Sequence, residues 1–369
     1  MTANNKNIDK QGKKLLNVPN LRFPEFEGEW TTKRLEDCVL FLDDQRKPVK
    51  SSDRQNVPGI YPYYGASGII DYVDNYLFDD DLILLSEDGA NILDRNYRVS
   101  FISRGKVWIN NHAHVLKPKP LYSIDYLSEY LESLDYNIYN TGTTMPKLNQ
   151  EVCRGIKIYV PSESEQKKIG RFLNLVNERI STQNRIIEKY ESLIKGIAKQ
   201  LAKHTPNTRI ADCVECHSST LQENQLDGEG IYKVYGANGL CGYTKTPSIS
   251  GDSILIVKDG SGVGNVSYVN GDYSVIGTSN YLTAKESFSL RYIYYCLMVF
   301  NFQPYKTGMA IPHIYFKDYG KAKIYCPKRE QQENIAAILY IIEHKINMEK
   351  SIKDLFISQK KYLLRSMFK

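Results

Sequence analysis

The sequence contains no apolar run that approaches the roughly 18 residues needed to cross a membrane, and its first residues lack the hydrophobic stretch of a signal peptide. Its seven cysteines are odd in number and lack the spacing of a disulfide framework. Both observations favour a cytoplasmic protein with reduced thiols and no membrane partner. The formal net charge of +6 is a mild basic excess, which is compatible with nucleic acid but does not require it.

The motifs of self-contained active sites are missing as well. The chain has no G-x-x-x-x-G-K-[ST] phosphate loop, no [DN]-P-P-[FY] motif for methylating an exocyclic amine, and no PD…[DE]-x-K nuclease cluster. Gly260–Gly264 is rich in glycine but lacks the third fingerprint glycine, and no helical pattern follows it, which favours a hairpin turn. We therefore expect a protein that is not an enzyme and has no catalytic residues.

A cofactor or metal site is also not expected on this chain. Cys213–His217 matches the C-x-x-C-H pattern of haem attachment, but that chemistry requires export, and zinc would need further closely spaced ligands. Cys213 aligns with Cys38 in an earlier segment, where a buried thiol would pack as a hydrophobe. His112 and His114 lie beside strand residues without a nucleophile partner, so we expect structural or surface roles for both.

A long heptad pattern is the strongest signal that the sequence does contain. From Pro161 to about Lys203, apolar residues recur at alternating steps of four and three, which is typical of a coiled coil. Residues 327–369 repeat this stretch at an offset of 166 (327 − 161). Two such helices bury their apolar seams best side by side and antiparallel. The expected seam consists of Ile169, Leu173, Val176, Ile180, Ile187, Ile194, Ile197, Leu201, Ile335, Leu339, Ile342, Ile346, Phe356 and Leu363.

The second helix breaks this pattern in three places. Glu349, Lys353 and Lys360 stand where the seam expects apolar residues. Ile352 and Leu355 lie beside them in the sequence and suggest that the buried stripe shifts there to another face of the helix.

The segments that precede the two helices also repeat each other. Tyr64–Gly68 returns as Tyr235–Gly239 at an offset of 171, and Asp88-Gly89 returns as Asp259-Gly260 at the same offset. The loop 141–148 returns as 307–314, now at an offset of 166, so five residues have been lost in between. A repeat this long indicates duplication of a domain rather than a solenoid.

The expected fold is α+β, with two similar globular α/β domains separated by two long helices that form an antiparallel coiled coil with pseudo-two-fold symmetry. The boundaries that we predict are a flexible tail at 1–20, a first domain at 21–160 and a first helix at 161–204, followed by a second domain at 205–326 and a second helix at 327–369.

Loop residues of mixed basic, polar and aromatic character are the candidates for binding. Arginine and lysine can neutralise phosphates or pair with guanine, and asparagine pairs with adenine. The two copies differ most in these loops, as two domains that recognise different sequences on one scaffold would. The candidates are Arg95, Arg98, Arg104, Lys106, Thr143, Thr144, Lys147, Lys258, Asn265, Tyr268, Tyr281, Lys306 and His313.

Three motifs together resemble the specificity subunits of type I restriction–modification systems. The first is the opening Leu21–Trp30 (LRFPEFEGEW), and the second is the T-G-x-x-x-P-x-[LI] loop at 141–148 and 307–314. The third is the start of each helix, with Pro161 followed by EQKKI and Pro327 followed by QQENI. The resemblance covers nearly the whole chain. The second loop departs from the first at 309–311, which leaves its contacts open.

The resemblance implies that each domain is a target-recognition domain and that the chain binds a bipartite, asymmetric site on double-stranded DNA. It also implies two modification subunits that methylate adenine, together with restriction subunits that cut DNA in phage defence. S-adenosylmethionine, ATP and Mg would belong to those partners. The alternatives are a DNA-free scaffold that bridges two proteins and, less in keeping with the missing motifs, a standalone enzyme.

Overall fold

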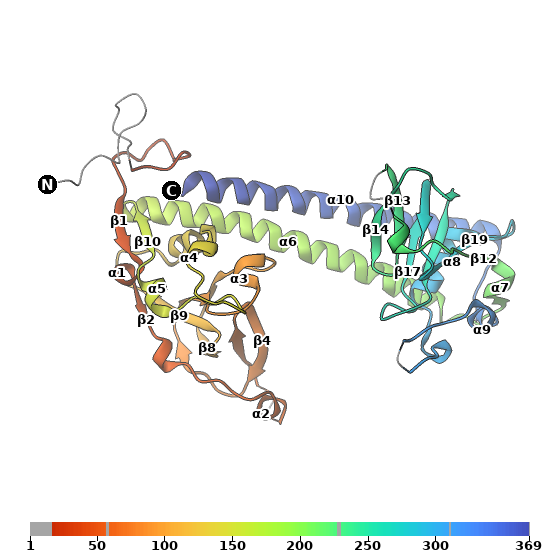
Figure 1. Cartoon of the computed structure of the whole chain (residues 1–369), viewed down its shortest axis with the longest axis horizontal. Helices are drawn as coiled ribbons and strands as arrows, with labels where there is room; N and C mark the ends of the chain where they lie inside the picture. Colours follow the sequence, from red (N-terminus) through yellow and green to blue (C-terminus); the bar gives the residue numbers. More distant parts are fainter. Residues whose placement is uncertain (1–16, 57–58, 227–229, 310, 369) are drawn as a thin grey trace. The chain divides into compact units, whose positions relative to one another are not determined.

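The structure is a computed structural model that describes residues 17–56, 59–226, 230–309 and 311–368 (Figure 1). Contacts divide the chain into two compact units, and each of them contains parts of both long helices. The first unit comprises residues 1–182 and 353–369, and the second comprises residues 183–352. Each globular domain is therefore built together with half of each helix.

The first domain contains two four-stranded sheets, with strand orders β2-β9-β6-β7 and β4-β3-β8-β5. A separate ribbon pairs the first and last strands, β1 and β10. The strands are β1 (Thr31–Arg34), β2 (Val39–Phe41), β3 (Tyr61–Gly65), β4 (Gly68–Val73), β5 (Phe78–Asp79), β6 (Leu82–Ser86), β7 (Ser100–Ser103), β8 (Lys106–Ile109), β9 (Ala113–Pro118) and β10 (Lys157–Val160). The helices are α1 (Leu35–Cys38), α2 (Ser51–Asn56), α3 (Asn91–Asp94), α4 (Ile124–Ser133) and α5 (Gln150–Arg154).

The second domain repeats this topology strand for strand, with sheet orders β12-β19-β16-β17 and β14-β13-β18-β15 and the ribbon β11-β20. Even the one parallel pairing, β3 with β8, recurs as β13 with β18. The strands are β11 (Thr208–Arg209), β12 (Val214–Ser218), β13 (Tyr232–Gly236), β14 (Gly239–Thr244), β15 (Ile249–Ser250), β16 (Ser253–Val257), β17 (Val266–Val269), β18 (Asp272–Val275), β19 (Ser279–Ala284) and β20 (Lys323–Ile324). The helices are α7 (Ile210–Cys213), α8 (Leu290–Met298) and α9 (Phe316–Tyr319).

The five residues that separate the two repeat offsets lie in a single hairpin. Residues 87–99 join β6 to β7 in the first domain, whereas residues 258–265 join β16 to β17 in the second. The longer connection contains α3, whose C-cap residue Arg95 has a left-handed backbone (φ 56°). The hairpin expected at Gly260–Gly264 is confirmed, since β16 and β17 pair antiparallel on either side of it.

The long helices α6 (Glu163–Leu201) and α10 (Arg329–Met367) pair antiparallel, as the seam predicted. In the first unit, Leu173 near the start of α6 belongs to the same hydrophobic cluster as Leu363 near the end of α10. In the second unit, Ile194 near the end of α6 clusters with Leu339 near the start of α10. Every residue of the predicted seam is buried or half-buried. At about 1.5 Å per residue, each helix extends for roughly 58 Å.

The predicted shift of the seam in α10 is wrong. Ile352 and Leu355 are exposed, while Glu349 is buried and Lys353 and Lys360 are half-buried. The seam therefore runs straight through the three charged positions. It can do so because two of them find polar partners, which replace the water that burial removes.

Glu349 obtains its partner from the matching position of the other repeat. Gln183 of α6 donates a hydrogen bond to the Glu349 carboxylate inside the second unit, and the two residues are 166 positions apart. Lys345, one turn away on α10, adds an ion pair to Glu349 at 3.3 Å. A polar pair in an otherwise apolar seam favours one register over others, because any slip would leave both groups buried without partners.

The glutamine of each helix-start motif has the same structural role in both units. Gln166 accepts from the Ser123 amide (3.0 Å) and donates to the Pro161 carbonyl (3.1 Å). Gln332 accepts from the Ser289 amide (3.0 Å) in the same way and donates to the Pro327 carbonyl (2.8 Å). Ser123 and Ser289 are the N-cap residues of α4 and α8. The motif thus fixes the start of each long helix to a helix of its domain.

The LRFPEF segment packs across the helix ends of the first unit. Arg22 forms a bidentate ion pair with the buried carboxylate of Glu165 (both contacts 2.8 Å), and Phe23 packs edge-on against Phe172. The tail predicted at 1–20 falls mostly at 1–16, outside the described residues. Its last part is not a tail, because the Asn17 carbonyl accepts from the Trp30 amide at 2.8 Å.

Candidate nucleic-acid interface

Two motifs that are distant in the sequence meet in each domain. In the first domain, the Leu148 amide donates to the Glu87 carbonyl (2.7 Å) and the Gly89 amide donates to the Pro146 carbonyl (3.0 Å). These bonds join the Asp-Gly turn after β6 to the T-G-x-x-x-P loop. We call the two segments together the paired loops, which are residues 87–95 with 140–148 in the first domain and 258–265 with 307–314 in the second. Residue 310 lies outside the described residues.

The second paired loops are joined by the same bonds. The Ile314 amide donates to the Lys258 carbonyl and the Gly260 amide donates to the Pro312 carbonyl, both at 3.0 Å. The turns in the two domains match because Gly89 and Gly260 both have positive φ, at 109° and 94°. A side chain at either position would strain that backbone.

Each T-G-x-x-x-P loop also closes on itself. The Thr141 amide donates to the Lys147 carbonyl at 2.8 Å, and the Thr307 amide donates to the His313 carbonyl at 2.9 Å. The intervening residues face solvent in both loops, and they differ between the domains. The exposed residues are Thr143, Thr144 and Met145 in the first loop and Met309 and Ile311 in the second. A fixed backbone thus presents variable side chains, which suits recognition of different sequences.

The two paired loops differ in charge at one matching position. Glu87 in the first domain pairs with Arg46 (2.6 Å) and with Lys147 (3.5 Å). At the equivalent position the second domain has Lys258, and no ion pair of the described residues involves it. Lys258 and Lys317, together with one acidic residue, Asp259, line a recess of ≈ 430 Å³ beside the second paired loops. This recess is suited to an anionic group such as a phosphate.

A buried polar pair, Asp43 and His114, contacts the first paired loops through the Leu148 carbonyl. His114 Nδ1 lies 2.7 Å from Asp43 Oδ2, and His114 Nε2 lies 2.8 Å from the Leu148 carbonyl oxygen. Both partners are acceptors, so both ring nitrogens must donate and the ring is an imidazolium. Burial alone would lower the pKa of His114, but the hydrogen bonds to Asp43 and Cys153 raise it to about 10. The structural role expected for His114 is confirmed by its burial.

The second domain has an uncharged pair of residues at the equivalent place. Ser218 donates to Asn280 Oδ1 at 2.8 Å, and these residues take the places of Asp43 and His114 on the equivalent strands. The pKa of Asp43 is below its ordinary value, because its hydrogen bond to His114 and the charge on that ring outweigh the effect of burial. Of the two equivalent pairs, only the one in the first domain contains titratable groups.

The stability of the first unit should depend on pH through His114. The folded pKa of about 10 lies above the unfolded value of roughly 6.5, so the stabilisation is complete below pH 6.5 and is lost as the pH rises through 10. Replacing His114 with asparagine should cost about 3 kcal/mol at pH 6, because Asp43 is left buried without its partner. The substitution should also reduce the change in the free energy of unfolding between pH 6.5 and pH 10. Urea unfolding at several pH values would measure this change.

The matched control for this prediction is the double variant Asp43→Ser with His114→Asn, which copies the residue pair of the second domain. The double variant should lose less free energy of unfolding than the two single variants lose in sum, because it leaves no unpaired charge behind. If the alkaline loss of stability persisted in His114→Asn, the assignment of the charge to this ring would be wrong.

Two of the predicted binding residues have their charges engaged inside the first domain. Arg98 pairs with the buried carboxylate of Glu129 at 2.6 Å, and Arg95 pairs with Glu132 at 3.0 Å. Arg95 also lies over the Tyr136 ring. Both guanidiniums therefore attach the β6–β7 connection to α4, and the geometry disfavours contact with DNA by either.

Other candidates lie away from the paired loops. Arg104 is exposed and pairs with Asp81 (2.5 Å), beyond the opposite end of β6, and Lys106 lies over the Tyr76 ring. Tyr268 is half-buried, packs against Tyr294 of α8 and donates to Asp252.

The predicted residues that do gather are Thr143, Thr144 and Lys147 in the first paired loops and Lys258, Asn265 and His313 in the second. Lys306 immediately precedes the second loop and is half-buried. Tyr281 stacks on His217 (4.8 Å) within the β12–β19 pair. DNA contact by any of these residues stays a prediction.

Sequence reasoning missed several exposed residues of these loops. Met145, Met309 and Ile311 are large apolar side chains in contact with solvent, and Lys317 lines the recess next to Lys258. The available signal was the repetition of the Asp-Gly turn and the T-G-x-x-x-P loop, which marked both segments without showing that they meet.

The side chains of Cys213 and His217 do not meet at a common site. Cys213 is buried with its Sγ 3.7 Å from Cys326 Sγ, whereas His217 bonds to Thr283 on the neighbouring strand. Within the described ranges, no group of three or more His, Cys, Asp or Glu side chains is placed to hold a metal ion. Nor does the described part of the chain include a helix long and apolar enough to span a membrane.

Comparison with known families decides the assignment that the motifs suggested. The model of the type I restriction modification DNA specificity domain matches residues 27–192 and again residues 207–355. The chain belongs to this family. The two matches fall on the two repeats, which confirms the resemblance and the internal duplication read from the sequence.

Individual proteins that are similar to this chain are also named as specificity subunits of type I restriction enzymes. A putative type I restriction enzyme specificity subunit of Haemophilus influenzae is 36% identical over 148 residues, covering 40% of this chain and 37% of that protein. The MjaVIII specificity subunit of Methanocaldococcus jannaschii is 26% identical over 192 residues, covering 49% and 43%. The chain thus aligns with less than half the length of these relatives.

Solved structures share the fold. The S subunit of a type I restriction–modification system from M. genitalium aligns with 95% of this chain and 99% of its own, with a TM-score of 0.66 at 16% identity. A chain from a structure of complex assembly in a type I system aligns over 92% of this chain with a TM-score of 0.52 at 13% identity. The α+β fold with two domains and two long helices is therefore confirmed.

Proposed function

We propose that this chain is the DNA-recognition subunit of a type I restriction–modification complex, and that its two domains recognise the two halves of a bipartite, asymmetric site. The observation that carries this proposal is the duplication of the paired loops. Their backbone bonds are the same in both domains, while the exposed side chains and the charge at Glu87 and Lys258 differ. A loop backbone that is the same in both domains but presents different side chains is suited to the recognition of two different half-sites.

Side chains of the paired loops, together with Lys317 beside the second pair, can make both kinds of contact that DNA recognition requires. Lys147, Lys258 and Lys317 can neutralise phosphates, which fix position without reading sequence. The hydroxyls of Thr143 and Thr144 and the apolar side chains of Met309 and Ile311 can contact base edges and the thymine methyl group.

Chemistry on the DNA would belong to other subunits. A base must leave the stack before it can be methylated, so the recognition subunit has to hold the duplex while a partner acts on the extruded base. S-adenosylmethionine for methyl transfer, and ATP with Mg for restriction, would then be bound by the modification and restriction subunits.

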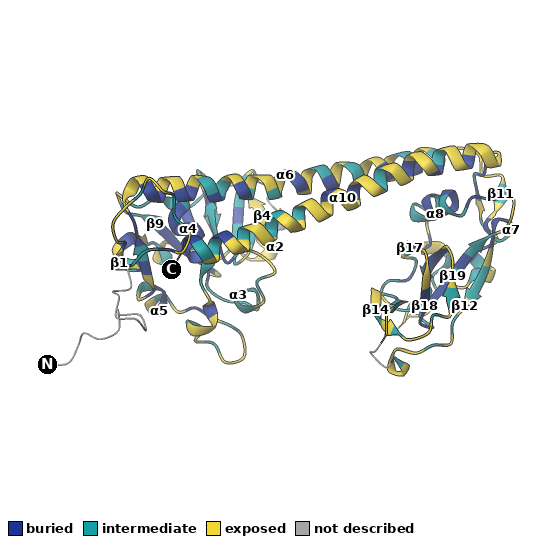
Figure 2. Cartoon of the chain, turned by 90° about the horizontal axis from the view of Figure 1, so that it is seen from above, coloured by how far each residue is buried: buried dark blue, intermediate teal, exposed yellow. Residues whose placement is uncertain are grey.

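The partner surface that we propose for the modification subunits is a second apolar stripe on α10. In the second unit, Ile338, Ile341 and Met348 are exposed at steps of three and seven along α10, on a different face from the buried seam. Figure 2 shows exposed residues along the outer faces of both long helices. An exposed apolar stripe on a helix that already has a partner, here interrupted at Lys345, is suited to a further helix from another protein.

Replacing Ile341 with glutamate should weaken assembly with the modification subunits at least tenfold, since a charge would be placed in the apolar contact. The measurement is co-purification or calorimetric titration of the modification subunit. Asn347→Glu, on an exposed position outside the stripe, is the matched control and should assemble normally. Equal binding by the two variants would contradict docking on this stripe.

The DNA-recognition proposal is tested by the salt dependence of DNA binding. Phosphate contacts release counterions, so log affinity should fall steeply and linearly with log salt. A scaffold that bridges two proteins without DNA would show no saturable binding to duplex DNA, and that result would overturn the proposal.

A further inference from the structure

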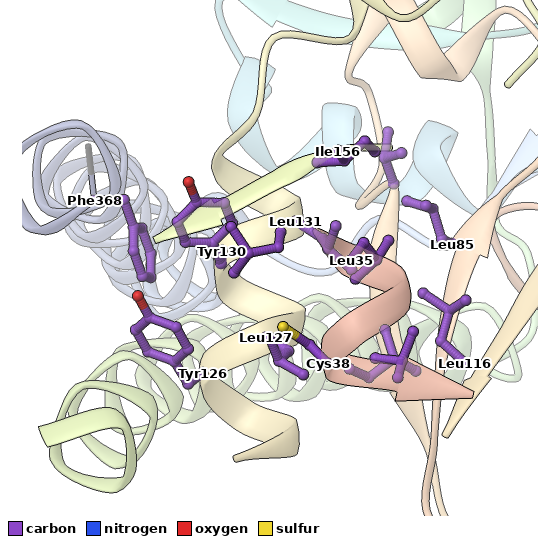
Figure 3. Close-up of a cluster of buried hydrophobic side chains, with 14 of the residues drawn as sticks. Leu35, Cys38, Leu85, Leu116, Tyr126, Leu127, Tyr130, Leu131, Ile156 and Phe368 are labelled. Carbon is purple, nitrogen blue, oxygen red and sulfur yellow. The ribbon is translucent and has the colours of Figure 1, made fainter. Parts of the chain in front are cut away.

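The junction between α10 and the first domain is closed by two aromatic rings. Phe368, at the end of α10, packs edge-on against Tyr126 and Tyr130 of α4, with ring centroids 5.5 Å and 5.2 Å apart (Figure 3). Tyr130 Oη donates to the carbonyl of Lys157 at 3.3 Å. Phe368 is 6% exposed and Tyr130 is 1% exposed, so both rings are buried in this junction.

The second unit has the same junction, built from the end of α6 and from α8. Tyr292 occupies the place of Tyr126, and both hydroxyls donate to the carbonyl of the equivalent residue, Tyr325 in one unit and Tyr159 in the other (2.8 Å and 2.5 Å). Counting back 166 residues from Phe368 gives Ala202, and counting forward 166 from Tyr130 gives Cys296. Both aromatic residues are therefore replaced by small ones.

The space that the two rings would fill is open in the second unit. A cavity of ≈ 300 Å³, which is open to solvent on the side of the exposed Ala202, is lined by Ala202 and Cys296 and by Val299, Phe300, Tyr305 and Tyr325. Lys323, the equivalent of Lys157, also lines it. An engineered apolar cavity of about 150 Å³ is known to bind benzene, so this volume is ample for a substituted ring.

We propose that this cavity is a binding site for a small phenolic ligand. Its ring would lie where Tyr130 and Phe368 lie in the first unit, against Phe300 and Tyr305, and its hydroxyl would donate to the Lys323 carbonyl as Tyr130 donates to that of Lys157. The first unit thus shows which chemical group the junction accepts. Because the cavity joins α6 to the second domain, a bound ring would stiffen that junction.

The experiment is a titration of the full chain with phenol, followed by calorimetry and by the melting temperature. Wild type should take up one phenol per chain and melt at a higher temperature as phenol is added. Ala202→Phe, which supplies the missing ring, should melt higher than wild type without phenol and lose the uptake. Ala337→Phe, at an exposed alanine of α10, is the matched control and should bind phenol like wild type.

Two further variants keep the test decisive. Cys296→Tyr fills the cavity from the opposite wall and replaces Ala202→Phe if that variant does not fold. Phe368→Ala opens the equivalent space in the first unit and should add a second phenol site. The absence of saturable uptake by wild type, or uptake that survives in both filled variants, would overturn the proposal.

Discussion

Replacing Glu129 with alanine should lower the free energy of unfolding of the first unit by about 3–5 kcal/mol. The Glu129 carboxylate is 2% exposed and lies at 2.6 Å from Arg98, 3.1 Å from Lys360 and 2.8 Å from Asn177. These partners come from the β6–β7 connection, from α10 and from α6, so one side chain of α4 connects the first domain to both long helices. Without it, Lys360 would be left with an uncompensated charge in the seam.

The pKa values of Glu129 and Lys360 agree with the view that the Glu129 carboxylate compensates the charges around it. Burial alone would raise the pKa of Glu129, but the charges of Arg98 and Lys360 hold it below its ordinary value. Burial lowers the pKa of Lys360 even with Glu129 present. The stability that Glu129 contributes should therefore be complete above its unfolded pKa of about 4.3 and be lost as the pH falls through the lower, folded value.

Urea unfolding of Glu129→Ala, with hydrogen exchange of α4, measures this cost. Glu163→Ala is the matched control: this glutamate pairs with Lys167 on the exposed surface of α6, so its loss should cost less than about 0.5 kcal/mol. Adding Lys360→Met to Glu129→Ala should recover part of the loss, because the orphaned charge is removed as well. A cost below 1 kcal/mol for Glu129→Ala would show that the cluster does not hold the unit together.

Replacing Lys258 with glutamate should weaken DNA binding at least tenfold and reduce the salt slope by about one. The substitution gives the second paired loops the charge that Glu87 has in the first, but without Arg46 to neutralise it. It places an anion beside the recess that we assign to a phosphate. Fluorescence anisotropy with duplex DNA at several salt concentrations measures both quantities.

The matched control for this effect is Lys195→Glu, which makes the same change of charge on the exposed surface of α6. If the reversal at Lys258 acts through a local phosphate contact, only that variant should bind weakly. An equal loss in both variants would indicate a general charge effect, and no loss in either would contradict the placement of DNA at the second paired loops.

The features that could be predicted from the sequence are those that repeat. The offsets of 171 and 166 showed two copies of one domain, and the heptad pattern showed the seam and its antiparallel pairing. Gln183, which stands at a polar position of the seam between Ile180 and Ile187, pairs with Glu349 at the matching position of the second repeat. Patterns of this kind depend on residues that are near one another in the chain or recur at a fixed interval.

The features that could not be predicted depend on pairs of residues that only folding brings together. Arg98 looked like a loop cation until its partner Glu129, 31 residues away, came into view (129 − 98). The shift assigned to Ile352 and Leu355 was wrong because α10 has two apolar stripes, and periodicity alone does not tell which one is buried. The meeting of the paired loops is a long-range contact of the same kind.

The central claim is that each domain recognises one half of a divided site. Mapping modified adenines in cells with and without this gene tests it most directly, extended to cells in which residues 60–157 are exchanged for those of another such domain. The account predicts a gene-dependent motif of two half-sites with a fixed gap, of which the exchange alters one half and leaves the other unchanged. A continuous motif, or an exchange that alters both halves, would contradict it.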